Sequence, residues 1–408
     1  MRNPLSRLGA ILERDPRKDP NAVVFLLLTA GVIAFPILVQ VFTRGSGSFL
    51  ISQAADAGVY VLLAIGLNVV VGFAGLLDLG YAAFFAIGAY TYAFVASDHM
   101  EFTPIHQAIH IPFWIALLVG MFAAAGAGAI LGAPTLRLRG DYLAIVTLGF
   151  GEIVPRLFRN ASTWTSGVNG ISALDTPALP IWLNGPWSGD ALAVVQNFKI
   201  IDPLAYYVIM AILVAISVVL VNNLRKSRMG RAWMAVREDE VAAAAMGVNT
   251  VGVKLLAFGI GAAFSGFAGT FYGAKLSLVS PENFGFTVSI TILIMVVLGG
   301  MGNIPGVIVG ALLIYYVIFN ILPGLPQQAV DFANQLGATG LNTPSGDWPG
   351  LAGEVQRLKY LIFGLILVLT MLLRPQGLLP SRQRAEELQK GVHDDTTIED
   401  VNAETGTA

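Results

Sequence analysis

The chain has 408 residues, of which 55% are hydrophobic and only 12% are charged, and its formal net charge is −2. Soluble domains carry about a quarter of their residues as charges, so this composition excludes an ordinary soluble protein. The 24 Lys and Arg residues form no single basic stripe, which argues against a nucleic-acid partner. With no cysteine and only four histidines, the sequence also predicts no disulfide, no metal cluster and no bound cofactor.

Ten apolar stretches have roughly the 17 to 22 residues that a helix needs to cross the hydrocarbon core of a bilayer. In chain order they are 22–42, 54–72, 76–96, 112–133, 142–158, 203–221, 255–273, 284–300, 305–322 and 358–373. The first is too long for the apolar core of a signal peptide, which has about 7 to 15 residues. The chain is therefore predicted to be an all-α polytopic membrane protein with about ten transmembrane helices.

The basic residues predict how the chain is oriented. If the N-terminus is cytoplasmic, 17 of the 24 Lys and Arg residues fall on the cytoplasmic side and seven on the other side. Cytoplasmic loops of membrane proteins carry the excess of Lys and Arg. Both termini are therefore predicted to be cytoplasmic. The same bias places loop 222–254 inside and loops 159–202 and 323–357 outside.

Composition divides the chain into three segments. Residues 1–21 are predicted to form a cytoplasmic N-terminal segment and residues 22–380 the transmembrane domain, from which the basic, Ala-rich loop 222–254 extends into the cytoplasm. Residues 381–408 contain seven acidic and three basic residues and almost nothing apolar. Because such a segment cannot bury enough apolar surface to fold, the tail is predicted to be disordered.

Glycine follows two patterns. Two hairpins resemble each other, since Gly-Phe-Ala-Gly at 72–75 and Gly-Gly-Met-Gly at 299–302 each separate two apolar stretches; an internal repeat would explain this, and chance is the alternative. Small residues also recur every four positions, which predicts close packing of helices in the membrane. These stripes are Gly120, Ala124, Gly128 and Gly132; Gly261, Ser265, Gly269 and Gly273; and Gly302, Gly306 and Gly310.

Charged residues within the predicted spans are few, and each costs free energy unless it is paired or solvated. Asp56, Arg156 and Lys359 lie at span ends, where an interfacial position explains them. Asp78 follows the first glycine break, so it is either a helix-entry charge or a functional group. Glu152 lies within Gly149-Phe-Gly151-Glu-Ile-Val-Pro155, which predicts a broken helix. This carboxylate either binds the freed main-chain amides or lines a polar path.

The inner loop contains a predicted helix. Residues 231–246 are strong helix formers and are followed by Gly247, a residue that favours the left-handed conformation at a helix end. A short exposed helix of this kind suits binding by a soluble motor domain. The alternative is an ordinary solvated connector.

Several long strings resemble one family. Residues 67–81, 137–152, 167–171 and 298–302 resemble the M-type permease of high-affinity branched-chain amino-acid ABC importers, and residues 374–380 match the end of that family's last span. The resemblance runs in order from about residue 54 to 380. The inner loop is also similar to the coupling motif E-A-A-x-x-x-G. Ala242, Ala243 and Gly247 match it, but Val241 replaces the glutamate and Glu240 precedes it by one position.

The resemblance implies a transport subunit in a bacterial cytoplasmic membrane. It implies four kinds of partner: a second homologous permease, two ATP-binding cassette ATPase subunits, an extracytoplasmic substrate-binding protein and membrane lipid. The chain itself has no G-x-x-x-x-G-K-[ST] phosphate loop, so ATP hydrolysis must come from a partner. Within the inner loop, the residues expected to couple the permease to the ATPase are Arg231, Arg237, Glu240, Ala242, Ala243 and Gly247.

A zwitterionic substrate needs polar groups along its path. The candidates are Asn68, Asp78, Thr147, Gly149, Gly151 and Glu152. A urea or short-amide permease of the same family is the closest alternative, although Asp-Leu-Gly-Tyr at 78–81 favours the amino-acid branch. A self-sufficient secondary transporter would not explain the coupling-like loop. A membrane enzyme would need a catalytic cluster, and the sequence contains no recognisable one.

Overall fold

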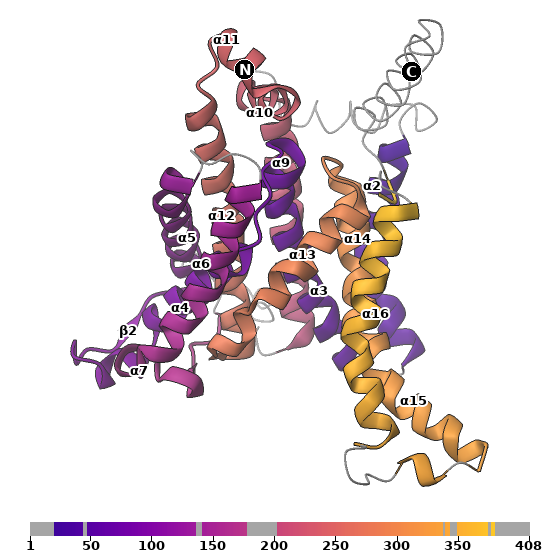
Figure 1. The fold of residues 1–408 in the computed structure, drawn as a ribbon. Coiled ribbons are helices and arrows are strands. Elements are labelled where there is room, and N and C mark those ends of the chain that lie inside the picture. The colour runs from indigo at the N-terminus through magenta and orange to yellow at the C-terminus, as the bar shows by residue number, and fades with distance from the viewer. Residues whose placement is uncertain are drawn as a thin grey trace, which may run out of the picture.

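The computed structural model describes residues 20–43, 47–135, 141–177, 202–337, 339–342, 349–373 and 377–379. Four predicted features lie wholly or largely outside these residues: the N-terminal segment, the basic pair Arg137 and Arg139, the middle of loop 159–202, and the acidic tail. Most of the described residues are helical (Figure 1).

The first half of the chain contains α2 (Pro20–Phe42), α3 (Ser48–Leu67), the π-helix η1 (Asn68–Phe73), α4 (Tyr81–Val95), η2 (Asp98–Phe102), α5 (Phe113–Thr135), α6 (Asp141–Asn160), α7 (Ser162–Thr165) and η3 (Gly167–Asn169). The second half contains α9 (Pro203–Lys226), α10 (Arg228–Glu238), α11 (Glu240–Ala245), α12 (Thr250–Leu276), η5 (Pro281–Phe284), α13 (Phe286–Gly299), α14 (Ile304–Tyr316), the π-helix η6 (Val317–Ile321), α15 (Leu322–Gln335), η7 (Thr339–Asn342) and α16 (Leu351–Leu373).

Two short antiparallel strand pairs join loops at one end of the bundle. Strand β1 (Ala96–Ser97) pairs with β2 (Ile109–His110), with Ala96 opposite His110. Strand β3 (Ile171–Ser172) pairs with β4 (Leu278–Val279), with Ile171 opposite Val279. The second pair ties the segment after α6 to the end of α12, although they are far apart in the sequence.

Seven helical stretches within the described residues are long and apolar enough to cross a bilayer. They are Val24–Phe42, Ser48–Phe73, Phe113–Thr135, Pro203–Lys226, Thr250–Leu276, Pro281–Gly299 and Ile304–Gln335. Helix α4 is apolar but has only 15 residues, and α6 and α16 cover the two other predicted spans. The chain is therefore an all-α polytopic membrane protein, but the predicted count of ten spans is not confirmed, and neither is an internal repeat.

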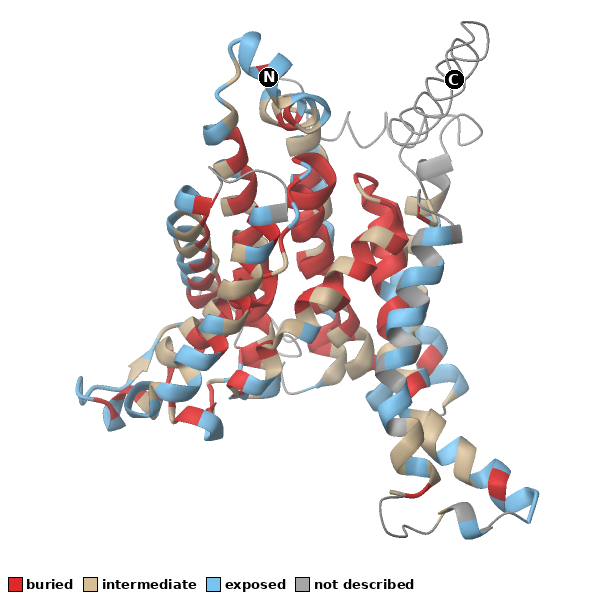
Figure 2. Ribbon diagram, viewed as in Figure 1, coloured by how far each residue is buried: buried red, intermediate tan, exposed pale blue. Residues whose placement is uncertain are grey.

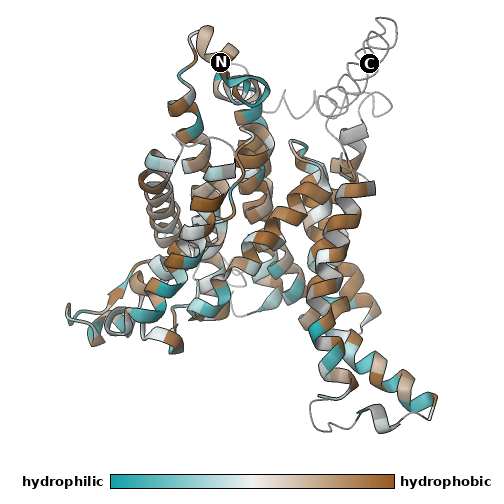
Figure 3. Cartoon of the chain, viewed as in Figure 1, coloured by the Kyte–Doolittle hydropathy of each residue, from teal (hydrophilic) through white to brown (hydrophobic). Residues whose placement is uncertain are grey.

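The two ends of the bundle differ from its middle. Helices α10 and α11 lie at one end, whereas β2, α7 and α15 lie at the other (Figure 1). Hydrophilic residues concentrate at these ends and hydrophobic residues between them (Figure 3). This arrangement agrees with the prediction that loop 222–254 lies on the opposite side of the membrane from the described parts of segments 159–202 and 323–357.

Helix α12 lies at the centre of the core, packed against α3, α4 and α5. Buried residues concentrate in this part of the bundle, and α16 is much more exposed (Figure 2). Small residues make the contacts: Gly88 of α4 touches the backbone of Gly266, and Gly120 of α5 lies against Thr270. The predicted packing role of the stripes on α5 and α12 is confirmed, because small side chains let these backbones approach closely.

Three sequence-based predictions of local structure were wrong. Helix α6 is unbroken through Pro155: an interior proline removes a main-chain hydrogen bond and destabilises a helix, and packing of α6 against α4 offsets that cost. The predicted single helix 231–246 is two helices separated at Asp239. The predicted external loop 323–357 contains most of α15, whose polar and apolar residues alternate with helical spacing.

Candidate functional site

The chain between η1 and α4, residues 74–80, forms a sharply bent segment that we call the glycine loop. Gly75 has a φ of +70°, a conformation that favours glycine. The Leu76 amide donates back to the Val70 carbonyl at 3.1 Å. Asp78 is buried, and one of its carboxylate oxygens accepts a hydrogen bond from the Gly80 amide at 2.9 Å. Asp78 therefore shapes the loop from inside the chain.

The glycine loop packs against α6. The Leu79 amide donates to the Thr147 hydroxyl at 3.1 Å, and that hydroxyl donates to the Ala144 carbonyl at 3.0 Å. Gly80 and Gly151 face each other so closely that a Cβ on Gly151 would lie 3.0 Å from the Gly80 Cα. Thr147 and Gly151 thus form the seat of the loop. A Cβ on Gly149 would meet open space, so this glycine is not needed for packing within the described part of the chain.

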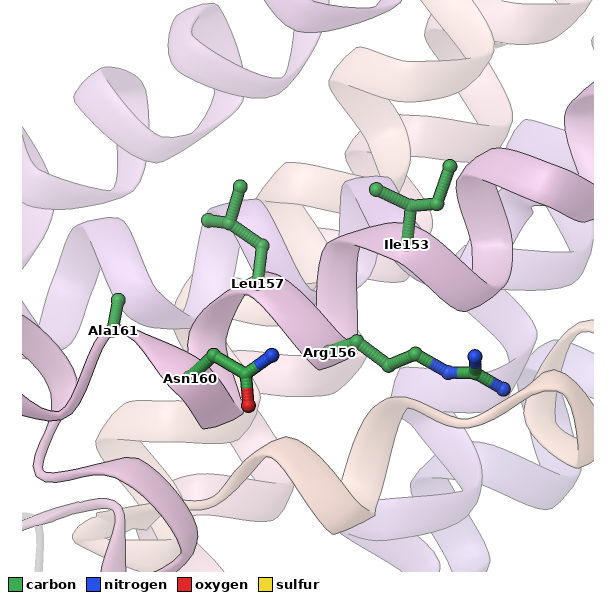
Figure 4. Close-up of a pocket in the computed structure, with 5 residues that line it drawn as sticks. All are labelled: Ile153, Arg156, Leu157, Asn160 and Ala161. Carbon is green, nitrogen blue, oxygen red and sulfur yellow. The ribbon is translucent and has the colours of Figure 1, made fainter.

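Glu152 lies on the outward face of α6 and pairs with Arg156, with 3.2 Å between Oε2 and Nη2. Their side chains are 43% and 72% exposed. A charged pair in contact with lipid tails is costly, so this face suits a polar path or another subunit better than lipid. One turn further on, Ile153, Arg156, Leu157, Asn160 and Ala161 line an open groove (Figure 4).

The second glycine turn, residues 300–303 between α13 and α14, contacts η1, the π-helix that leads into the glycine loop. The side-chain oxygen of Asn68 accepts a hydrogen bond from the Gly302 amide at 2.8 Å, and Asn68 is fully buried. The end of the described chain pairs with the same turn, since the Leu378 amide donates to the Leu298 carbonyl at 2.7 Å. Asn68 therefore joins two breaks that are 234 positions apart, and it lies away from the surface of the subunit.

Helices α10 and α11, which we call the inner helix pair, are anchored to α12. Trp233 of α10 is completely buried, and its indole N–H donates to the Val253 carbonyl at 2.7 Å. Glu240 forms an ion pair of 2.6 Å with Lys254. The carboxylate of Glu240 thus faces the membrane domain of its own chain. Trp233 and Lys254 were missed from the sequence, because neither stands out within its local pattern.

Helix α11 presents an apolar tip to solvent. Asp239 caps its start by accepting hydrogen bonds from the amides of Val241 and Ala242 at 2.8 and 3.0 Å. Val241 and Met246 are 73% and 86% exposed. Ala242 is also exposed, whereas Ala243 is buried. Exposed apolar side chains on so short a helix suit burial by a partner.

Gly247 ends α11 as the sequence predicted. Its φ is +84°, so the predicted left-handed conformation is confirmed. The Val248 amide donates to the Ala243 carbonyl at 3.1 Å, which completes the turn.

Arg231 and Arg237 of α10 point in different directions. Arg231 is exposed and donates to the Lys226 carbonyl at 3.0 Å on its own segment. Arg237 is part-buried and donates to the Gly72 carbonyl at 2.6 Å, at the entrance to the glycine loop. Its aliphatic stem lies over Gly75, where a Cβ would come within 2.7 Å of the arginine Cγ. The sequence did not reveal this contact, because it joins residues 165 positions apart.

At the opposite end of the bundle, His110 of β2 lies between two carboxylates. Its Nδ1 is 2.7 Å from Asp175 and its Nε2 is 3.0 Å from Asp98. The hydrogen bond to Asp175, followed by that to Asp98, raises the pKa of His110. The cluster fastens the segment after β3 to the β1–β2 hairpin.

The fold and these contacts define a class: a polytopic membrane protein with a buried glycine loop and an exposed helix pair at one end. Residues 49–371 match the family described as the branched-chain amino acid transport system / permease component. The chain belongs to this family. It is therefore a transport subunit and not an enzyme.

Named relatives agree with this assignment. The chain is 38% identical over 381 residues to the high-affinity branched-chain amino acid transport system permease protein LivM of Escherichia coli, covering 92% of this chain and 78% of the relative. It is 24% identical over 350 residues to a probable LivM of Methanocaldococcus jannaschii, covering 80% and 91%. It is 27% identical over 261 residues to LivH of Escherichia coli, covering 62% and 79%. No solved structure shows significant similarity to the chain.

Proposed function

We propose that this chain is the M-type permease subunit of an ATP-binding cassette importer for branched-chain amino acids in a bacterial inner membrane. The observation that carries the proposal is the 38% identity to LivM over 92% of the chain. The weaker similarity to LivH supports a pair of related permeases, in which the partner subunit is a homologue of this chain. An extracytoplasmic binding protein would deliver the substrate.

Two ATPase subunits would bind the inner helix pair. The exposed apolar side chains of Val241 and Met246 favour α11 as the element that enters a groove of the ATPase. Glu240 faces Lys254 of its own chain, so its role is to hold α11 on α12. We infer that α4, α6 and α16 also cross the membrane, which gives ten crossings and places both termini in the cytoplasm.

The outward face of α6 is the proposed lining of the path. An amino acid crosses the bilayer as a zwitterion, so its charges need polar partners. Glu152 and Arg156 offer both signs of charge on one helix face. Asn68, Asp78 and Thr147 are buried within the subunit, and they support the path by fixing the two glycine turns.

Reconstitution into liposomes tests this function. The chain is coexpressed with a candidate partner permease and two ATPases and assayed with a binding protein, and ATP-dependent leucine uptake is expected. The chain by itself should show neither ATPase activity nor uptake. ATP-dependent uptake of urea but not leucine would favour the short-amide branch. Uptake by the isolated chain driven by a proton or sodium gradient would refute the importer and indicate a secondary transporter.

A further inference from the structure

Arg237 makes a contact that a purely ATPase-facing residue would not need. Its guanidinium donates a 2.6 Å hydrogen bond to the Gly72 carbonyl, and it is part-buried rather than exposed. A charge-assisted hydrogen bond of this length is stronger than one between neutral groups. The contact is also steric, since the arginine stem occupies the space beside Gly75. Arg237 thus connects α10 both to the end of η1 and to the start of the glycine loop.

The end of η1, which leads into the glycine loop, has little room to move. A Cβ on Gly72 would collide with the side-chain oxygen of Asn68 and would lie 2.6 Å from the Gly302 amide nitrogen. The backbone of Gly72 is thus held between Arg237 on one side and the second glycine turn on the other. Closely packed interiors transmit displacement because they lack free volume.

The far end of the loop and the first turn of α4 contact two further helices. The Leu79 amide is bonded to Thr147 of α6, and the Ala82 amide donates to the Ser289 hydroxyl of α13 at 2.9 Å. Gly80 lies against the α6 backbone at Thr147 and Gly151. Leu79 follows Gly72 by seven positions, so these contacts form a continuous connection from Arg237 to the helix that carries Glu152.

From these contacts we propose that Arg237 is a positioning residue that transmits the movement of the inner helix pair through the glycine loop to α6. The inference rests on the proposed importer function, because only a permease driven from its cytoplasmic side needs such a connection. It assigns Arg237 a role within the chain, distinct from docking of the ATPase. The docking surface remains the exposed tip of α11.

Arg237→Met separates the two parts of the contact, because methionine retains an aliphatic stem over Gly75 but cannot donate to the Gly72 carbonyl. The matched control is Arg228→Met, which removes an exposed arginine from the start of the same helix, away from the exposed tip of α11. In the reconstituted complex, we expect leucine uptake per ATP hydrolysed to fall about tenfold in Arg237→Met, the effect of losing a hydrogen bond to a charged group. The control should keep the wild-type ratio, and both variants should bind the ATPase normally.

A direct readout of the loop distinguishes transmission from a merely structural role. The chain has no cysteine, and Leu77 in the glycine loop is 40% exposed, so a spin label at Leu77→Cys reports on the loop. Adding ATP should change its spectrum in the wild-type background and not in Arg237→Met. Arg237→Lys, which keeps a cationic donor on a flexible stem, should restore part of the response.

Two results would overturn the proposal. One is a wild-type ratio of uptake to ATP hydrolysis in Arg237→Met. The other is a spectral change on adding ATP in Arg237→Met that equals the wild-type change, together with reduced ATPase binding. That result would mean that Arg237 only stabilises α10. If Arg237→Met does not assemble, Arg237→Lys is judged by the same two measurements. Failure of the importer function itself would be recognised separately, because the wild-type complex would then show no ATP-dependent uptake.

Discussion

The crossing of α4 and α12 provides the sharpest test of the packing described above. A Cβ added to Gly88 would lie 2.5 Å from the Gly266 Cα and closer still to its carbonyl oxygen. Carbon atoms in contact lie about 3.5–4.0 Å apart, so α4 and α12 would have to separate by about 1 Å in Gly88→Ala. Both colliding groups belong to the backbone, which means that no side-chain rotation relieves the clash.

The expected loss of stability follows from this geometry. Overpacking a tight site typically costs about 1–3 kcal/mol, and helix association in lipid depends mainly on such close packing. The cost of Gly88→Ala is expected at or above the upper end of that range, because α12 packs against α5 and α3 as well. Separating α4 from α12 therefore disturbs the whole centre of the core.

Thermal stability in detergent, measured as the loss of monodisperse protein on heating, checks this prediction. The matched control is Gly126→Ala on α5, where a Cβ would meet no atom within 4 Å. Because alanine is favoured over glycine in a helix by roughly 0.5–1 kcal/mol, the control should be as stable as the wild type or slightly more stable. Equal stability of Gly88→Ala and Gly126→Ala would refute the packing argument.

Three further predictions concern other parts of the chain. Gly247→Val is expected to weaken ATPase copurification and abolish uptake without lowering expression, because a left-handed conformation at φ +84° is strained for a β-branched residue; normal copurification and transport would contradict this. Single cysteines at Phe102 and Met246, which are 79% and 86% exposed, should be labelled from opposite sides of the membrane, and labelling of both from one side would contradict the topology. The pKa of His110 is raised in the folded protein. Its hydrogen bonds to Asp175 and Asp98 therefore stabilise the fold fully below about pH 6.5, and this stabilisation is lost as the pH rises through the raised pKa. The Tm difference between wild type and His110→Gln should therefore be larger at low than at high pH, and a constant difference would contradict the contact.

Local features of the sequence predicted a large part of this molecule. Apolar stretches gave the positions of the helices, because the length and hydropathy of a membrane span are properties of the span itself. Gly247 was correctly expected to be left-handed, since its neighbours are helix formers and glycine alone adopts that conformation freely. Where a local rule was overridden, as at Pro155 within α6, the cause was packing against other helices.

The contacts that define the candidate site were decided by the tertiary structure. Arg237 meets Gly72 across 165 positions and Asn68 meets Gly302 across 234, and no short-range pattern marks either pair. In a soluble protein the apolar stripe of a helix indicates which face turns inward. Lipid is as apolar as the protein interior, so the sequence of a membrane helix fixes its length but leaves its rotation and depth to be set by its neighbours.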